Sequence, residues 1–188
     1  MLTVYIDFKS AQAYLAMKST LALADRLKLR INWRPFRTVE RYVPKLGTEE
    51  TVGERHRRVR AASQRALAKK YAAHQGLALT YPDVLGASDL ALGALALFDG
   101  DRLPFIQAAF EAYWIDHLDL DSPETVTHLM TKTGTKLNDL STARDALDKA
   151  QGAAEDAGIV GAPAYVIDEQ IFVGREHLPW IEEIAAKA

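Results

Sequence analysis

Residues 2–16 read LTVYIDFKSAQAYLA, and a change of pattern inside this stretch decides the fold. Residues 2–8 are dense in β-branched and aromatic side chains, which predicts a strand. Their nearly continuous apolar character suits a strand that is buried on both faces. From Ser10 onward good helix formers follow, with Ser10 in the position of an N-cap. Residues 29–36 alternate like a second strand, so the sequence predicts a strand–helix–strand unit with parallel strands and a right-handed crossover.

The middle of the chain shows helical periodicity and no convincing strand. The predicted helices cover residues 52–75, 87–97, 103–115, 123–133 and 141–157. Ser122-Pro123 and Ser141 have the composition of helix starts. Glycines that follow the periodic segments, as helix ends usually require, are Gly76, Gly134 and Gly158.

Strands return near the C-terminus. Residues 164–167 and 171–173 are rich in apolar and β-branched side chains, and they flank Asp168-Glu169-Gln170 as a hairpin. Residues 178–186 form a closing helix. The predicted order is therefore β-α-β, a helical block, and then β-β-α. We expect the two outer segments to form one sheet, with the helical block inserted between them.

Length and composition restrict the classes of protein that the sequence can encode. The chain has 188 residues, 48% of them apolar, and a formal net charge of −2. This composition supports a real core and gives no general attraction to nucleic acid or to an acidic membrane. No apolar stretch is long enough to span a bilayer. The first residues have the pattern of a strand and not of a signal peptide, so we expect a cytoplasmic protein.

The sequence contains no cysteine. Disulfide bonds, thiolate metal sites and dithiol redox chemistry carried by the chain are therefore excluded, and with them a disulfide oxidoreductase. If a thiol takes part in the function, a ligand must supply it. We also expect no metal, because none of the histidines has the spacing or the acidic neighbours of a zinc site. They are His56, His74, His117, His128 and His177.

Ser10 is the first candidate for a functional side chain. In one interpretation it only caps the helix, which is a common role of serine. In the other it also serves a ligand, because a helix N-terminus offers free N–H groups and the positive end of a dipole. A hydroxyl group there can donate a hydrogen bond to a thiolate and lower the pKa of the thiol. The two interpretations are compatible, and the local sequence does not choose between them.

A second candidate is the segment Gly161-Ala162-Pro163-Ala164-Tyr165, which comes directly before a predicted strand. Proline in this position is often only a strand start. A cis bond between Ala162 and Pro163 would turn the backbone of Ala162 outward. That backbone could then pair with a peptide-like ligand as an added strand.

The ordered segments resemble the DsbA-like branch of the thioredoxin superfamily. Within that branch they are similar to the 2-hydroxychromene-2-carboxylate isomerases and the kappa-class glutathione transferases. The similar stretches span nearly the whole chain. They are YIDFKSAQAYLA at 5–16 (family DF-x-SPYSYLA), FEAYW at 110–114 with LDL at 118–120, GIVGAPAYV at 158–166 (family GVFGVPTFV) and FVGREHL at 172–178 (family FWGNDRL).

The resemblance implies an α/β, thioredoxin-like fold with a large all-helical insertion. Residues 1–38 plus 158–188 would form the thioredoxin-like domain, and residues 39–157 the inserted helical domain. The family binds glutathione, so glutathione is the implied cofactor. An aromatic or carboxylate-bearing small molecule is the implied substrate. Enzymes of this family are often homodimers, although no residue of this sequence specifies an interface.

The resemblance also assigns roles to individual residues. The family's serine at the helix start, here Ser10, hydrogen-bonds the sulfur of glutathione. The residue before the cis-proline, here Ala162 before Pro163, pairs with the cysteinyl backbone of glutathione. An acidic residue after the hairpin, here Glu176 beside Arg175, holds the γ-glutamyl end. Further candidates for the pocket are Lys9, Gln12 and His177.

The sequence departs from the family pattern at four positions. Ala11 replaces a proline, and Gln12 stands where an aromatic residue is frequent. Glu176 replaces an aspartate, and Arg175 replaces a small polar residue. Arg175 and Glu176 also have a structural interpretation as exposed polar residues that open the last helix, where a glutamate suits the helix dipole. These departures leave the particular substrate, and glutathione binding itself, open.

The most basic segment begins at residues 54–60, ERHRRVR, and continues with Arg65, Lys69 and Lys70. A solvated helix face is the simplest interpretation. The alternative is a positive rim that attracts carboxylate substrates. The segment lacks the extent and the interleaved aromatic residues of a nucleic-acid surface. The tryptophans, which we expect in the core or at an interface, are Trp33, Trp114 and Trp180.

Three functional hypotheses remain at this point. The first is a glutathione-dependent isomerase of the 2-hydroxychromene-2-carboxylate isomerase type, in which Ser10 activates the glutathione thiol. The second is glutathione conjugation by the same site, as in the kappa class. The third is a non-catalytic thioredoxin-like binding domain that has lost its chemistry.

Overall fold

The computed structural model describes residues 1–39, 43, 50–82, 86–137 and 139–187. Packing divides the chain into two compact units, one of Met1–Thr38 with Tyr81–Ala188 and one of Val39–Thr80. The predicted division at residues 39 and 157 placed all the inserted helices in a domain of their own. In the structure, the helices after residue 80 instead belong to the same compact unit as the sheet. The parts of the predicted helical block at 40–42, 44–49, 83–85 and 138 lie outside the described residues.

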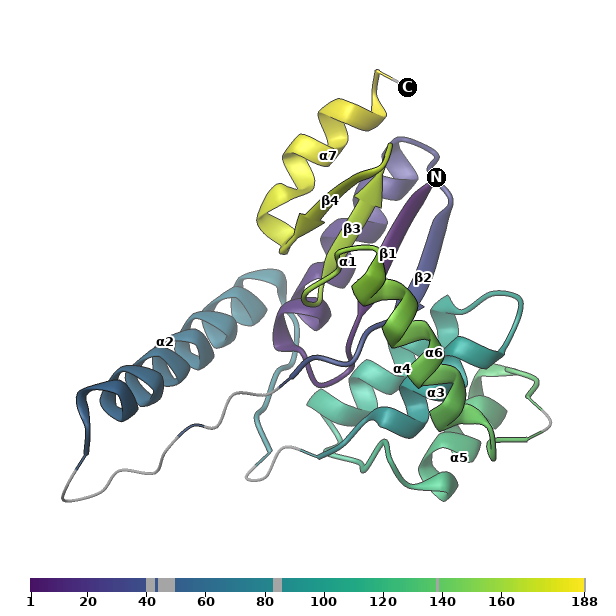
Figure 1. Ribbon diagram of the computed structural model, residues 1–188, viewed down its shortest axis with the longest axis horizontal. Helices are drawn as coiled ribbons and strands as arrows, with labels where there is room; N and C mark the ends of the chain where they lie inside the picture. The colour runs from purple at the N-terminus through teal and green to yellow at the C-terminus, as the bar shows by residue number, and fades with distance from the viewer. Residues whose placement is uncertain (40–42, 44–49, 83–85, 138, 188) are drawn as a thin grey trace. The chain divides into compact units, whose positions relative to one another are not determined.

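A four-stranded mixed sheet organises the first unit (Figure 1). The strands are β1 (Leu2–Ile6), β2 (Ile31–Pro35), β3 (Ala164–Ile167) and β4 (Gln170–Val173), in the order β2-β1-β3-β4. β1 pairs with β2 in parallel and with β3 antiparallel, and β3 pairs antiparallel with β4. The predicted parallel pair and the single sheet built from the two ends of the chain are confirmed.

The described part of the first unit also contains six α-helices. They are α1 (Ala11–Arg26), α3 (Asp89–Leu97), α4 (Leu103–Trp114), α5 (Pro123–Thr133), α6 (Ala143–Asp156) and α7 (Leu178–Ala185), with a short 3-10 turn, η1 (Arg175–His177), before the last. α1 and α7 lie on one face of the sheet, where Leu2, Val4 and Ile6 of β1 are buried. α6 lies on the other face, where its Ala154 packs in a cluster with Tyr5. The predicted α/β architecture with a helical insertion is confirmed.

The ends of the helices follow the predicted signals with one exception. Gly76 and Gly134 have φ of +68° and cap α2 (Val52–Gln75) and α5 in the left-handed conformation. The Ser122 hydroxyl accepts from the N–H of Thr125 at the start of α5. The prediction of Ser141 as a helix start is wrong, because α6 begins at Ala143 and the Ser141 hydroxyl instead donates to the carboxylate of Asp139.

Two smaller predictions also need correction, and a third is narrowed. β1 is not buried on both faces: Thr3 and Tyr5 are half-buried, since α6 covers only part of their side of the sheet. The hairpin turn has two residues, Asp168 and Glu169, both with positive φ, and Gln170 already pairs in β4. Of the two places expected for the tryptophans, the core is excluded for Trp180, which is 58% exposed, whereas an interface stays a prediction.

The second unit contains the 24-residue helix α2. A capping box opens it: the Thr51 hydroxyl accepts from the N–H of Glu54, and the Glu54 carboxylate accepts from the N–H of Thr51. The guanidinium of Arg58 donates twice to the carboxylate of Glu50, at 2.7 and 2.8 Å. Among the residues that the structure describes, no helix combines the length and the hydropathy needed to cross a membrane.

Candidate functional site

Ser10 lies where β1 ends and α1 begins. Its backbone is extended, with φ −84° and ψ 108°, and its hydroxyl oxygen accepts from the N–H of Ala13 at 3.2 Å. The N–H of Ser10 donates to the carbonyl of Asp7 at 3.1 Å, which closes the turn. The predicted N-cap is therefore confirmed, and Ser10 stands at the positive end of a 16-residue helix.

The Ser10 hydroxyl also reaches a segment that is 152 residues away in the sequence. It donates to the carbonyl oxygen of Ala162 at 3.0 Å. The peptide bond between Ala162 and Pro163 is cis. The structure thus brings together the two candidates that the sequence analysis considered separately.

Several backbone donors around Ser10 have no hydrogen-bond acceptor within the described part of the chain. These are the N–H groups of Ala11 and Gln12 in the first turn of α1 and the N–H of Ala162. First-turn N–H groups favour a negatively charged ligand. A free N–H just before a strand offers one hydrogen bond to an extended peptide. The donor set therefore fits a peptide that carries a thiolate or a carboxylate.

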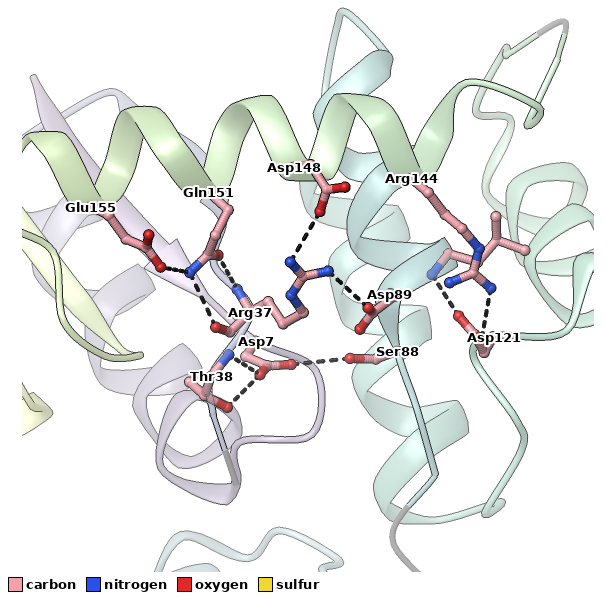
Figure 2. Close-up of polar contacts among 11 residues, drawn as sticks. Asp7, Arg37, Thr38, Ser88, Asp89, Asp121, Arg144, Asp148, Gln151 and Glu155 are labelled. Carbon is pink, nitrogen blue, oxygen red and sulfur yellow. Dashed lines mark hydrogen bonds and ion pairs between the residues drawn. The ribbon is translucent and has the colours of Figure 1, made fainter. Parts of the chain in front are cut away.

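The side chain of Asp7 holds the turn between β1 and α1 in place. This side chain is fully buried and accepts from the N–H of Lys9 at 3.2 Å. It also accepts from the Ser88 hydroxyl at 3.0 Å and from the N–H of Thr38 at 2.8 Å (Figure 2). The Thr38 hydroxyl donates as well, at 2.5 Å. Burial raises the pKa of Asp7 above its ordinary value, and the hydrogen bonds from Thr38 oppose that rise only in part. The carboxylate connects the Ser10 turn to the segment after β2 and to the start of α3.

A further polar network holds the segment after β2 against α3 and α6 (Figure 2). The Arg37 guanidinium pairs with Asp89 and with Asp148, each at 3.0 Å. The N–H of Arg37 donates to the Gln151 side chain at 2.8 Å, and Gln151 donates back to the carbonyl of Arg37 at 3.3 Å. These contacts position Thr38, and through it Asp7.

Aromatic packing supports the same turn from the helical side. The Phe8 ring is buried and meets Phe105 and Phe110 edge-on, with centroid distances of 6.2 and 5.3 Å. The indole N–H of Trp114 donates to the carbonyl of Phe8 at 2.9 Å. Phe110 and Trp114 of the FEAYW stretch in α4 therefore contact Phe8 and support the turn that leads to Ser10.

The segment that follows β4 contacts the cis-proline, Pro163. The N–H of Gly174 donates to the carbonyl of Pro163 at 2.9 Å. Gly174 has φ of +106°, and a side chain there would overlap the carboxyl group of Glu176, which folds over it. Glu176 is exposed and Arg175 half-buried, and both act electrostatically on Tyr165 of β3. The structure thus brings Glu176 next to the Ala162–Pro163 segment, by way of Gly174.

The remaining candidates occupy different surroundings. Lys9 is half-buried in the turn between Asp7 and Ser10, and Gln12 is exposed on the first turn of α1. His177 packs against the ring of Phe172, with a centroid distance of 5.8 Å. No group of three metal-ligating side chains gathers within the described ranges.

The sequence analysis did not assign a role to Asp7 or to Trp114. Asp7 could have been noticed as a single carboxylate at the end of an otherwise apolar strand. Its partners Thr38 and Ser88 carry no local signal, because only the tertiary fold brings them to Asp7. Ser88 lies at the start of α3 without capping it, since its hydroxyl donates to Asp7 instead.

Comparison of the sequence with known proteins identifies a matching family and a similar relative. The family model described as DSBA-like thioredoxin domain matches residues 1–185. A 2-hydroxychromene-2-carboxylate isomerase from Sphingobium xenophagum is 26% identical over 187 residues, which cover 95% of this chain and 94% of the relative.

Solved structures show the same fold. A 2-hydroxychromene-2-carboxylate isomerase structure superposes with a TM-score of 0.74 at 18% identity, covering 99% of this chain and 94% of that one. A probable DsbA oxidoreductase from Streptomyces coelicolor superposes with a TM-score of 0.71 at 19% identity, covering 99% and 89% of the two chains. With a family match over nearly its whole length, this chain belongs to the DsbA-like thioredoxin domain family.

Proposed function

We propose that this protein is a glutathione-dependent isomerase of the 2-hydroxychromene-2-carboxylate isomerase type. The observation that carries the proposal is the position of the Ser10 hydroxyl. It lies at the N-terminus of α1 and within 3.0 Å of the carbonyl of Ala162. The isomerase of Sphingobium xenophagum, which is similar over 187 residues, supports the choice of reaction.

The residues around Ser10 suit a bound tripeptide thiol. The free N–H of Ala162 would donate to the backbone of its cysteinyl residue, and the carboxylate of Glu176 would hold the ammonium group at its γ-glutamyl end. Arg175 lies beside Glu176 and would face the carboxylate of the same end. This is the donor and acceptor set expected for an extended ligand that is zwitterionic at one end.

Bound glutathione would supply a thiolate nucleophile that adds reversibly to an electrophilic carbon of the substrate. Ser10 would release the Ala162 carbonyl and donate a hydrogen bond from its hydroxyl group to the sulfur, which favours the thiolate over the thiol. The N–H groups of Ala11 and Gln12 and the dipole of α1 act in the same direction. The protein thus contributes activation and placement of the nucleophile.

The ability to bind glutathione is tested by calorimetric titration of the wild type and of Ser10→Ala. Ser122→Ala is a matched control, because Ser122 caps α5 in the same way that Ser10 caps α1. The proposal expects binding to all three proteins, since backbone groups and Glu176 hold most of the ligand. Absence of binding to the wild type would contradict the proposal and favour a non-catalytic binding domain.

The reaction is tested by following 2-hydroxychromene-2-carboxylate in the presence and absence of glutathione. The proposal expects isomerisation that needs glutathione and that falls by about 10²-fold or more in Ser10→Ala, the size of a lost transition-state hydrogen bond. Ser122→Ala is expected to keep wild-type activity. Mass spectrometry of the products distinguishes isomerisation from conjugation, because a stable glutathione adduct would assign the kappa-class reaction instead.

A further inference from the structure

A hollow in the first unit is lined by the C-terminal end of α1, strand β2 and the loop between α3 and α4. Its volume is about 850 Å³. Met1 and Ile31, at the starts of β1 and β2, line it. Ser10 follows the opposite end of β1, so this hollow is separate from the candidate site described above.

Arg102 is held rigidly at the edge of this hollow. Its Nη1 donates to the carbonyl of Trp33 at 2.7 Å, and its Nε donates to the carbonyl of Phe98 at 3.2 Å. A guanidinium has five N–H donors, so three of them remain for other partners. The carbonyl groups of Trp33 and Phe98 therefore orient the guanidinium group of Arg102 without neutralising its charge.

Arg34 brings a second guanidinium to the same place. It is exposed on β2, lines the hollow, and repels Arg102. Burial, and then this repulsion, lower the pKa of Arg102 from its usual value. Within the described ranges neither arginine forms an ion pair with a carboxylate.

Three carboxylates line the hollow, and none of them forms an ion pair with Arg34 or Arg102 in the described structure. Asp25 pairs with Lys28 at 3.0 Å. Asp101 accepts from the N–H of Leu103, the first residue of α4, at 3.0 Å. Asp99 attracts Arg102 electrostatically but forms no ion pair with it in the described structure. Both arginines thus line the hollow, and neither has a carboxylate partner within the described ranges.

We propose that this hollow binds a small organic oxyanion, a phosphate monoester or a carboxylate, between Arg34 and Arg102. An oxyanion placed between two guanidinium groups accepts charge-assisted hydrogen bonds from both and removes their mutual repulsion. Leu21 and Leu29 are half-buried on the wall beside the arginines and provide a surface for an apolar body. The volume falls within the range of small-molecule sites, about 300–1,000 Å³.

Phenyl phosphate, benzoate and inorganic phosphate are suitable probes, and NMR chemical-shift mapping measures their affinity and their location. We expect phenyl phosphate or benzoate to bind with a dissociation constant of about 1 mM or lower and to shift the amide signals of Trp33, Arg34 and Arg102. Phenol, which lacks the oxyanion, is expected to bind at least tenfold more weakly. The stronger of the two aromatic anions identifies the ligand class, and inorganic phosphate measures the contribution of the apolar wall.

Arg34→Gln is the decisive variant, because Arg34 is exposed and its side chain forms no hydrogen bond or ion pair within the described ranges. We expect it to weaken binding at least tenfold, and Arg102→Lys, which keeps the charge but loses the fork, to weaken it as well. Lys132→Gln on α5 removes one exposed charge outside the hollow and is expected to leave the affinity unchanged.

Equal affinity in Arg34→Gln and the wild type would overturn the proposal. Shifts confined to the Ser10 turn, or no binding of any probe, would overturn it as well. Ser10→Ala is expected to bind the probes like the wild type. The result is therefore independent of glutathione binding and of the proposed isomerase activity.

Discussion

At the scale of single residues, a buried carboxylate is the unusual feature of this site. Asp7 is fully buried and accepts four hydrogen bonds from three separate segments. Such a group is retained only where its partners satisfy it, because an unpaired buried charge is very costly. Asp7 therefore acts as a positioning residue that holds the Ser10 turn, the end of β2 and the start of α3 in one arrangement.

The raised pKa of Asp7 predicts how its contribution to stability depends on pH. The folded-state pKa lies above the ordinary value of 3.8, so ionisation is less favourable in the folded protein than in the unfolded one. The contribution is complete below the unfolded pKa and is lost as the pH rises through the folded pKa. We expect the free energy of unfolding of the wild type, relative to Asp7→Asn, to fall as the pH rises above the ordinary pKa of 3.8 in urea titrations.

Asp139→Asn provides a contrast for this measurement. The Ser141 hydroxyl lowers the pKa of the exposed Asp139, so the contribution of that carboxylate is lost as the pH falls. The two variants should therefore show pH dependences of opposite sign. A difference between the wild type and Asp7→Asn that does not change with pH would contradict the account of Asp7.

At the scale of the elements, α3 and α6 approach each other closely at Gly93. A methyl group added to Gly93 would overlap the carbonyl group of Ala143, although the residue lies inside a helix where alanine is normally preferred. We expect Gly93→Ala to destabilise the protein by about 1–3 kcal/mol, the usual cost of overpacking. Thermal or urea unfolding measures this loss.

Gly152→Ala is the matched control for Gly93→Ala. Gly152 lies inside α6, and an added methyl group there would meet nothing within 4 Å. This variant should gain about 0.5–1 kcal/mol from helix propensity alone. A loss of stability in Gly152→Ala, or none in Gly93→Ala, would contradict the packing described here.

One buried hydrogen bond joins α1 to β3. The Thr20 hydroxyl lies 3.0 Å from the Tyr165 hydroxyl, and burial raises the pKa of Tyr165 to about 12. Thr20→Val leaves that phenol without a partner and should cost about 1–3 kcal/mol in unfolding experiments. Thr131→Val removes an exposed hydroxyl that bonds only within α5, and it is expected to change stability by less than about 0.5 kcal/mol.

At the scale of the whole molecule, much of the fold could be predicted from local patterns. Strand composition, helix periodicity and the capping residues at Ser10, Gly76 and Gly134 gave the element order and most boundaries. Each of these features depends on neighbours in the sequence, so the sequence alone contains enough information to predict them. The cis bond at Pro163 was implied only by the family resemblance, and the structure contains it.

The rest depends on contacts between distant segments. The approach of Ser88 to Asp7, of Trp114 to the carbonyl of Phe8 and of Arg102 to the carbonyl of Trp33 has no local signature. Each is a contact between segments at least 69 residues apart. The N-cap position of Ser10 could be anticipated from the local sequence and the cis bond after Ala162 from the family resemblance, whereas the groups that hold them in place could not.

The central claim is that Ser10 stabilises a ligand thiolate, and the pKa of the thiol of bound glutathione tests it most directly. Ultraviolet absorbance of the thiolate, followed against pH with saturating protein, gives this pKa. The account predicts a value about one or two units below the 8.5 of a free thiol in the wild type and in Ser122→Ala, and a rise of about one unit in Ser10→Ala. The same thiol pKa in Ser10→Ala and the wild type would contradict it.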